Sequence, residues 1–172
     1  SLINELSSLG FVQFNVSLAS INAGTLGREC RPTRLQSFEE CLMAVHELGR
    51  PCISYFICGL KGDTKEGIAQ TLLYLSRLPT RIGISLFYPV PGLPGFPKTA
   101  FRNCPPLLAT GVAAYPWNKS LSTESLITAF RLSRFVNAWK ERPQGLEGEL
   151  IDTIIREKRL FTITSMRPSG AG

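Results

Sequence analysis

Closely spaced cysteines are missing from this sequence. Its five cysteines form no C-x-x-C pair and no short-spaced set, whereas zinc and iron–sulfur sites are normally built from such sets. We therefore predict no metal site within the chain and expect buried thiols in a reducing compartment. The cysteines are Cys30, Cys41, Cys52, Cys58 and Cys104. The single histidine, His46, has no Cys or carboxylate constellation near it, so we interpret it as a structural residue.

Long apolar runs are also missing. No uninterrupted run approaches the roughly 20 residues that a membrane-spanning helix needs, and the first residues lack a basic region followed by an apolar signal core. The sequence therefore predicts a cytoplasmic protein with no membrane partner. The 172 residues correspond to a single domain, and the hydrophobic fraction of 44% is enough for a buried core.

Acidic residues are outnumbered, so the formal net charge is +6 and the pI is near 9.3. A nucleic-acid interface needs such charge on one face of the molecule. The basic residues fall instead into three small groups, which are Arg28, Arg31 and Arg34; Arg131, Arg134, Lys140 and Arg142; and Arg156, Lys158 and Arg159. Such groups are usually solvated helix faces, so we do not predict a nucleic-acid partner. RNA binding stays open on charge alone, and anion binding stays open for the first group.

Three short segments have the composition of β-strands. Residues 11–18, 52–60 and 83–88 are apolar and rich in β-formers, and 52–60 is almost wholly apolar. An apolar strand of this kind is typical of a parallel sheet that is covered on both faces. Three strands cannot close a barrel of about eight strands, so the sheet is either open or part of something larger.

Helical patterns separate these strands. Apolar residues recur at helical spacing over 37–48, where Ser37 and Glu40 make a capping box. Asp63 with Glu66 offers the start of a second helix. Strand and helix alternating through short connections is the pattern of right-handed parallel β/α units.

The composition changes after Tyr88, where prolines and glycines crowd a stretch without periodicity. Two helical patterns follow, over 122–139 and 146–158; they could pack on the sheet or pair with each other. We therefore predict an α/β fold in which parallel β/α units form half of a TIM-like barrel, with C-terminal helices. The expected division is a half-barrel at 1–95, a proline-rich linker at 96–121 and a helical extension at 122–172.

Several polar residues and glycines lie at the ends of the predicted strands. Ligands of parallel sheets bind outside the carboxyl ends of the strands, which makes candidates of Ser17, Ser20, Gly59, Gly62 and Tyr88. Ordinary turn hydrogen bonds for the serines, and tight turns that need positive φ for the glycines, stay open as structural alternatives.

The order of these pieces resembles the second half of a radical S-adenosylmethionine (SAM) barrel. The resemblance rests on NVSLAS at 15–20, on Arg31, on YFICGLKGDT at 55–64 and on LFYPVPG at 86–92, and it covers roughly residues 11 to 95. Its strongest part is a group of residues at the family spacing, namely Ile57, Gly59, Gly62 and Asp63, with Pro91 and Gly92 following.

The resemblance implies a cofactor site. In this family the fourth strand ends in a serine-rich turn that touches the ribose of SAM, which here corresponds to Ser17 and Ser20. The fifth strand ends in a turn whose backbone lies by the adenine, which here corresponds to the stretch from Ile57 to Gly62. Arg31 would clamp the amino-acid carboxylate of SAM, because its planar fork suits a bidentate carboxylate; a surface arginine is the alternative.

The resemblance also implies what the chain would need from elsewhere. The cysteine loop that holds the [4Fe-4S] cluster is absent from the matched part. The chain is thus expected to be a fragment of a radical SAM iron–sulfur oxidoreductase, inactive alone, with SAM and the cluster present in the complete enzyme. Its partner would be the missing N-terminal half of the barrel, and we also expect self-association through the open sheet edge.

Four positions depart from the family pattern. Ala19 stands where many members place a ribose-binding glutamate or glutamine, Lys61 where proline is usual, Asp63 where glutamate is usual, and Leu93 where threonine often follows. Ala19 favours an alternative hypothesis, in which the chain is a non-catalytic binding or assembly module with a degenerate half-barrel. The sequence indicates neither the substrate nor the reaction subtype.

Overall fold

A computed structural model describes residues 2–28, 34–92, 96, 98–102 and 105–141 of the chain. The elements follow in the order α1 (Leu2–Ser8), β1 (Phe14–Ala19), α2 (Ala23–Arg28), α3 (Leu35–Glu47), β2 (Cys52–Cys58), α4 (Lys65–Ser76), β3 (Arg81–Leu86) and α5 (Thr123–Lys140), with two short 3-10 helices at Lys98–Phe101 and Pro106–Ala109. The three predicted strands and the helices between them are present. The sequence pattern did not predict α1, and it indicated α2 only as a short helical-looking stretch before Arg31.

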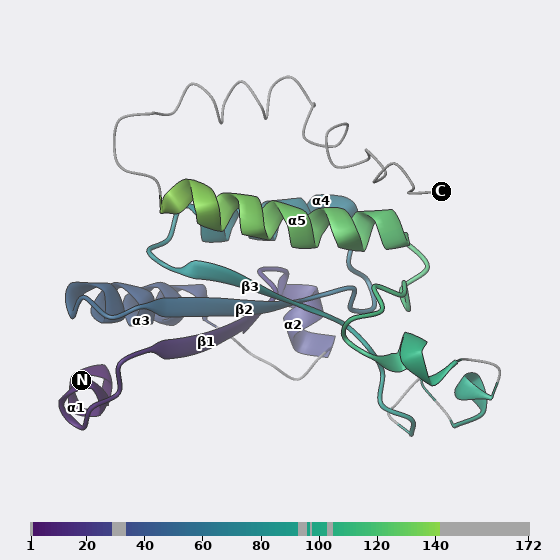
Figure 1. The fold of residues 1–172 in the computed structure, drawn as a ribbon, viewed down its shortest axis with the longest axis horizontal. Helices are drawn as coiled ribbons and strands as arrows, with labels where there is room; N and C mark the ends of the chain where they lie inside the picture. Colours follow the sequence, from purple (N-terminus) through teal and green to yellow (C-terminus); the bar gives the residue numbers. More distant parts are fainter. Residues whose placement is uncertain (1, 29–33, 93–95, 97, 103–104, 142–172) are drawn as a thin grey trace, which may run out of the picture.

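The strands form one open parallel sheet in the order β1-β2-β3 (Figure 1). Ser54, at the centre of β2, lies opposite Val16 of β1 and Ile82 of β3. Within the described residues, no further strand pairs with the outer edge of β1 or of β3. The predicted α/β class is therefore confirmed, and the sheet is consistent with part of a TIM-like barrel.

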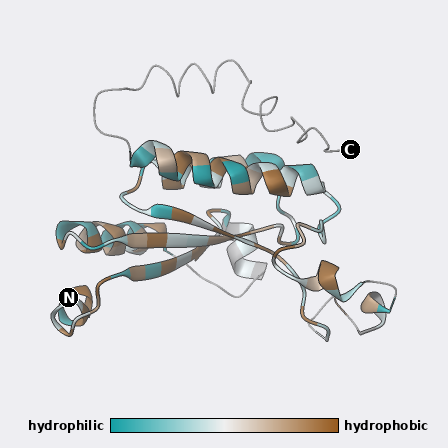
Figure 2. Ribbon diagram, in the orientation of Figure 1, coloured by the Kyte–Doolittle hydropathy of each residue, from teal (hydrophilic) through white to brown (hydrophobic). Residues whose placement is uncertain are grey.

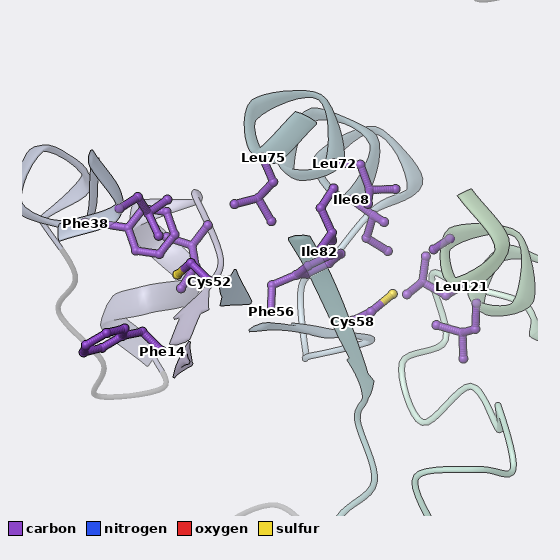
Figure 3. Packing of buried hydrophobic residues seen from close by; sticks show 14 of the residues in the cluster. Phe14, Phe38, Cys52, Phe56, Cys58, Ile68, Leu72, Leu75, Ile82 and Leu121 are labelled. Carbon is purple, nitrogen blue, oxygen red and sulfur yellow. The ribbon is translucent and has the colours of Figure 1, made fainter. Parts of the chain in front are cut away.

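The two faces of the sheet differ in what covers them. Side chains alternate between the faces of a strand, and in β2 the residues Cys52, Ser54, Phe56 and Cys58 are buried. Figure 3 shows Phe56 among the apolar side chains of the core, which also include Ile68, Leu72, Leu75 and Ile82. The other face is more open, since Tyr55 in the middle of β2 is 38% exposed. Figure 2 shows apolar and polar residues alternating along β1 and β3, whereas β2 is mostly apolar.

The structure corrects two predicted helix starts. The capping box at Ser37 and Glu40 is wrong, because α3 begins at Leu35 after Arg34 and has no side-chain cap. Glu40 Oε1 instead accepts a hydrogen bond from Gln36 Nε2 at 3.0 Å. Helix α4 is capped by Thr64, one residue after the predicted Asp63, and the Thr64 hydroxyl accepts a hydrogen bond from the Gly67 N–H at 3.1 Å.

Helix α5 packs along the outer edge of β3, beside α4 (Figure 1). The Asn137 side chain binds both backbone groups of Ile82: its Nδ2 donates to the Ile82 carbonyl at 2.8 Å, and its Oδ1 accepts from the Ile82 N–H at 2.7 Å. Lys140 Nζ donates to the carbonyls of Leu75, Leu78 and Thr80 at 2.7–2.8 Å. Burial lowers the pKa of this ammonium to about 8, although its three carbonyl acceptors favour the charged form.

Of the two helices predicted in the C-terminal half, the structure describes only the first. Helix α5 agrees within one residue with the prediction at 122–139. It is capped by Ser122, whose hydroxyl accepts a hydrogen bond from the Ser125 N–H at 3.2 Å. The helix predicted at 146–158 lies outside the described residues. The domain boundaries at 95 and 121 stay predictions. In the part of the chain that the structure describes, no helix is both long and apolar enough to cross a membrane.

Candidate functional site

A tight turn follows β2. Gly59 has φ 103° and Gly62 has φ 90°, a backbone region that residues with a side chain rarely adopt. The Asp63 carboxylate crosses this turn and accepts hydrogen bonds from the backbone N–H groups of Gly59 at 2.9 Å and Leu60 at 3.0 Å. The Asp63 N–H donates to the Leu60 carbonyl at 3.0 Å. The predicted glycine turn is therefore present, and its conformation is fixed by its own aspartate.

The end of β1 lies at the same edge of the sheet, because the strands are parallel. Ser20, directly after β1, is buried. Its hydroxyl accepts a hydrogen bond from the Asn22 N–H at 3.0 Å, and Asn22 Oδ1 accepts from the Thr25 N–H at 3.0 Å. Ser20 thus makes the ordinary turn hydrogen bond that the sequence left open as an alternative.

A pocket of about 250 Å³ lies between the connection after β1, the turn after β2 and the first turns of α4. Its polar lining includes Ser20, Asn22, Thr25, Asp63, Thr64 and Gln70. Phe56, Ile57 and Ile68 supply apolar surface. The volume is below the roughly 300–1,000 Å³ of pockets that enclose a whole drug-sized ligand. The pocket therefore suits one moiety of a ligand, such as a sugar or a base.

The structure divides the predicted site residues. Ser20, Ile57 and Gly62 line the pocket together. Ser17 is exposed and lies opposite Tyr55, on the open face of the sheet.

The other predicted residues lie apart from the pocket lining. Gly59 is buried behind the turn, and a Cβ at this position would lie 3.5 Å from Leu126 Cδ2. Tyr88 is 47% exposed beyond β3, with its ring against Gly111. Arg31 lies outside the described residues.

Sequence reasoning missed most of the polar lining. Asn22 and Thr25 come from the β1–α2 connection, and Gln70 and Thr71 come from α4, more than forty residues later in the chain. Asn22 carried a local signal, since asparagine is a favoured N-cap residue and Asn22 accepts the Thr25 N–H at the start of α2. Gln70 and Thr71 carried none, because only the packing of α4 beside the first turn brings them to the pocket.

The cysteines of the described residues do not fit an iron–sulfur cluster. An iron–sulfur cluster needs three or four thiolates gathered at one site. Among the described thiols, burial raises the pKa of Cys58 to about 12, and the Asp63 charge adds to this rise. Burial also raises the pKa of Cys41 and Cys52. No group of three His, Cys, Asp or Glu side chains suited to a metal ion occurs in the described ranges. Cys30 and Cys104 lie outside these ranges, so the expectation that the chain binds no iron stays a prediction.

The fold and the pocket define an α/β chain with a candidate ligand site at the carboxyl ends of parallel strands. Among solved structures it is similar to coproporphyrinogen III oxidase (HemN) from Escherichia coli, described as a radical SAM enzyme. The TM-score is 0.51 at 16% sequence identity, and the match covers 99% of this chain and 31% of that chain. No protein-family model matches the sequence, and neither does any curated protein. The likeness therefore shows a fold shared with part of that enzyme, over less than a third of its length.

Proposed function

We propose that this chain is part of a radical SAM enzyme and that its pocket binds the adenosyl part of S-adenosylmethionine. The observation that carries the proposal is the position of the pocket. It joins Ser20, after β1, to Ile57 and Gly62, around the end of β2, and these residues belong to the two motifs that resemble the family's ribose and adenine contacts. The likeness of the fold to a radical SAM enzyme supports the same assignment.

The chemistry of the pocket suits a nucleoside. A ribose offers hydroxyl groups that both donate and accept hydrogen bonds, and the lining supplies hydroxyl and amide side chains at Ser20, Asn22 and Gln70. An adenine needs an apolar surface and backbone groups, which Phe56 and Ile57 provide. The Asp63 carboxylate already holds two backbone N–H groups, so we assign it to the turn and not to the ribose.

The cluster and the rest of the barrel would come from outside this chain. In the complete enzyme the [4Fe-4S] cluster would supply the electron that starts the radical chemistry. Within this chain, the pocket residues would bind and orient the adenosyl part and exclude water from it. We place the missing N-terminal half of the barrel on the outer edge of β1, where a parallel strand would satisfy the unpaired backbone groups. Alone, the chain would be inactive and would self-associate through this edge.

The experiment is a titration of the chain with S-adenosylhomocysteine, which has the adenosyl part but no reactive sulfonium, followed by amide shifts in NMR spectra. Gly67→Leu is the blocking variant. Gly67 lines the pocket, and a Cβ there meets Thr64 Oγ1 at an ordinary 3.5 Å, while leucine favours a helix more than glycine does. The matched control is Ala69→Leu on the exposed side of α4.

We expect saturable shifts at Ser20, Gly62 and Asp63 in the wild type and in Ala69→Leu, and their loss in Gly67→Leu. An absence of shifts in the wild type at millimolar ligand would contradict the proposal. It would favour the non-catalytic binding or assembly module, to which Ala19 in place of a ribose-binding carboxylate or amide already points.

A further inference from the structure

The connection between β3 and α5 makes direct contact with the turn that borders the pocket. Asn118 belongs to this connection, and its Nδ2 donates hydrogen bonds to the carbonyls of Leu60 at 2.8 Å and Asp63 at 2.9 Å. We propose that Asn118 is a positioning residue for the ligand-binding turn, and that the connection is part of the site. The identity of the ligand rests on the proposed function. The effect of Asn118 on the turn rests on the geometry alone.

The turn is held from two sides by complementary groups. On one side the Asp63 carboxylate accepts from the N–H groups of Gly59 and Leu60. On the other side the Asn118 amide donates both of its hydrogens to the carbonyls of Leu60 and Asp63. A primary amide carries two N–H donors on one nitrogen, so this single side chain satisfies two carbonyl groups of the same turn.

Asn118 is itself well fixed. Its Oδ1 accepts a hydrogen bond from the Ser120 N–H at 3.0 Å, and its carbonyl accepts from the N–H of the buried Leu121 at 3.1 Å. Its neighbour Trp117 packs in an aromatic cluster, with ring centroids 5.0 Å from Tyr115 and 5.4 Å from Phe101. The segment predicted as a linker thus presents Asn118 to the turn from a packed support.

This fixation matters because the turn forms part of the pocket wall. Gly62 and Asp63 both line the pocket. Gly62 has a positive φ, and a glycine can change from this conformation to others at little energetic cost. A turn whose carbonyl groups lose their hydrogen-bond donors samples those conformations. Part of the binding free energy is then used to restore the conformation that binds the ligand. Asn118 would therefore raise ligand affinity without touching the ligand.

The test compares Asn118→Ala with Asn137→Ala, a matched control in which an asparagine side chain also loses two backbone hydrogen bonds. The first readout is amide hydrogen exchange at Gly59, Leu60 and Asp63. We expect it to quicken about tenfold or more beyond the change in global stability in Asn118→Ala, because the loss of one hydrogen bond allows a change of this size. In Asn137→Ala it should quicken no more than the change in global stability requires. The second readout is affinity for S-adenosylhomocysteine, which should fall about fivefold or more in Asn118→Ala only.

The outcomes separate the inference from the proposed function. Equal exchange of the turn amides in both variants would overturn the positioning role, whether or not the ligand binds. Faster exchange with unchanged affinity would also overturn it, because the turn would then be irrelevant to binding. If the wild type binds no S-adenosylhomocysteine, the proposed function fails, while the exchange comparison still decides whether Asn118 holds the turn.

Discussion

Replacing Asn137 by alanine removes two hydrogen bonds from the outer edge of β3. Ile82 pairs with β2 on one side, while its own N–H and carbonyl groups bind the Asn137 side chain at 2.7 and 2.8 Å. The amide of Asn137 thus occupies the place that a neighbouring strand would take. Ile82 is only 4% exposed, so in the intact protein its backbone groups depend on the Asn137 side chain and not on water.

The expected loss of stability follows from these two groups. A buried donor or acceptor left without a partner costs about 1–3 kcal/mol, but the groups lie at a sheet edge, where water can enter once the side chain is shortened. We therefore expect Asn137→Ala to lower the free energy of unfolding by about 2–4 kcal/mol. This is a large part of the total for a domain of this size, about 5–15 kcal/mol, yet the variant should remain folded.

Urea unfolding measures this loss, and amide exchange at Ile82 locates it. In the wild type the Ile82 amide should exchange slowly although it lies at a sheet edge, and in Asn137→Ala it should exchange much faster. Arg134→Ala, at an exposed position of the same helix, is the control and should change neither measurement. An Asn137→Ala variant with wild-type stability and a slow Ile82 amide would refute the reasoning that α5 closes this edge.

Two further substitutions test the sheet and the docking of α5. Gly83→Ala should lower the free energy of unfolding by about 1–3 kcal/mol, because its Cβ would lie 2.6 Å from the Tyr55 ring; a Tyr55→Ala background should remove most of this cost in a double-mutant cycle. Lys140 has a folded pKa near 8 against an ordinary 10.5, so the unfolded state holds this proton more tightly. Its contribution should make the stability of the wild type rise from pH 8 to 10 relative to Lys140→Met. Measuring the difference cancels groups such as Cys58, whose raised pKa lowers stability above pH 9. A difference that is flat with pH would contradict the lowered pKa.

The parts of the fold that the sequence predicts are those with local signals. Apolar segments separated by helical periodicity predict the three parallel strands and the helices α3 and α4, and the apolar periodicity over 122–139 predicts α5. The spacing of Gly59 and Gly62 predicts a turn with positive φ, and both glycines have it. These signals depend on residues that are neighbours in the chain, which is why sequence reasoning can use them.

The capping predictions fail where two local roles compete for one residue. Asp63 is a good helix cap by type, yet its carboxylate turns back to the amides of Gly59 and Leu60, and Thr64 caps α4 instead. Ser37 and Glu40 have the spacing of a capping box, yet α3 extends two residues further back to Leu35. In both cases the residue type suits a helix cap, but the helix starts at a neighbouring position.

Two long-range contacts, made by Asn118 and Asn137, have no local signal in the sequence. Asn118 lies 55 residues after Asp63, and Asn137 lies 55 residues after Ile82. Asparagine is common in loops and on helix surfaces, so neither residue stands out in the sequence. Both nevertheless satisfy backbone groups that are otherwise the weak points of an open sheet, one at the end of β2 and one at the edge of β3.

Because α5 occupies the β3 edge, further strands can extend the sheet more easily at the β1 edge. At the β3 edge, Asn137 already binds the Ile82 backbone and Lys140 binds the carbonyls that precede the strand, so a further strand would have to displace α5. In the described residues β1 pairs with β2 alone, and the exposed Phe11 and Val12 lead into it. A strand that extends this sheet, from the rest of a barrel or from a second copy, can therefore pair with β1 without displacing a helix. A radical SAM barrel assembled in this way would have β3 as its last strand, with the proposed adenosyl pocket between the two strands nearest the added half.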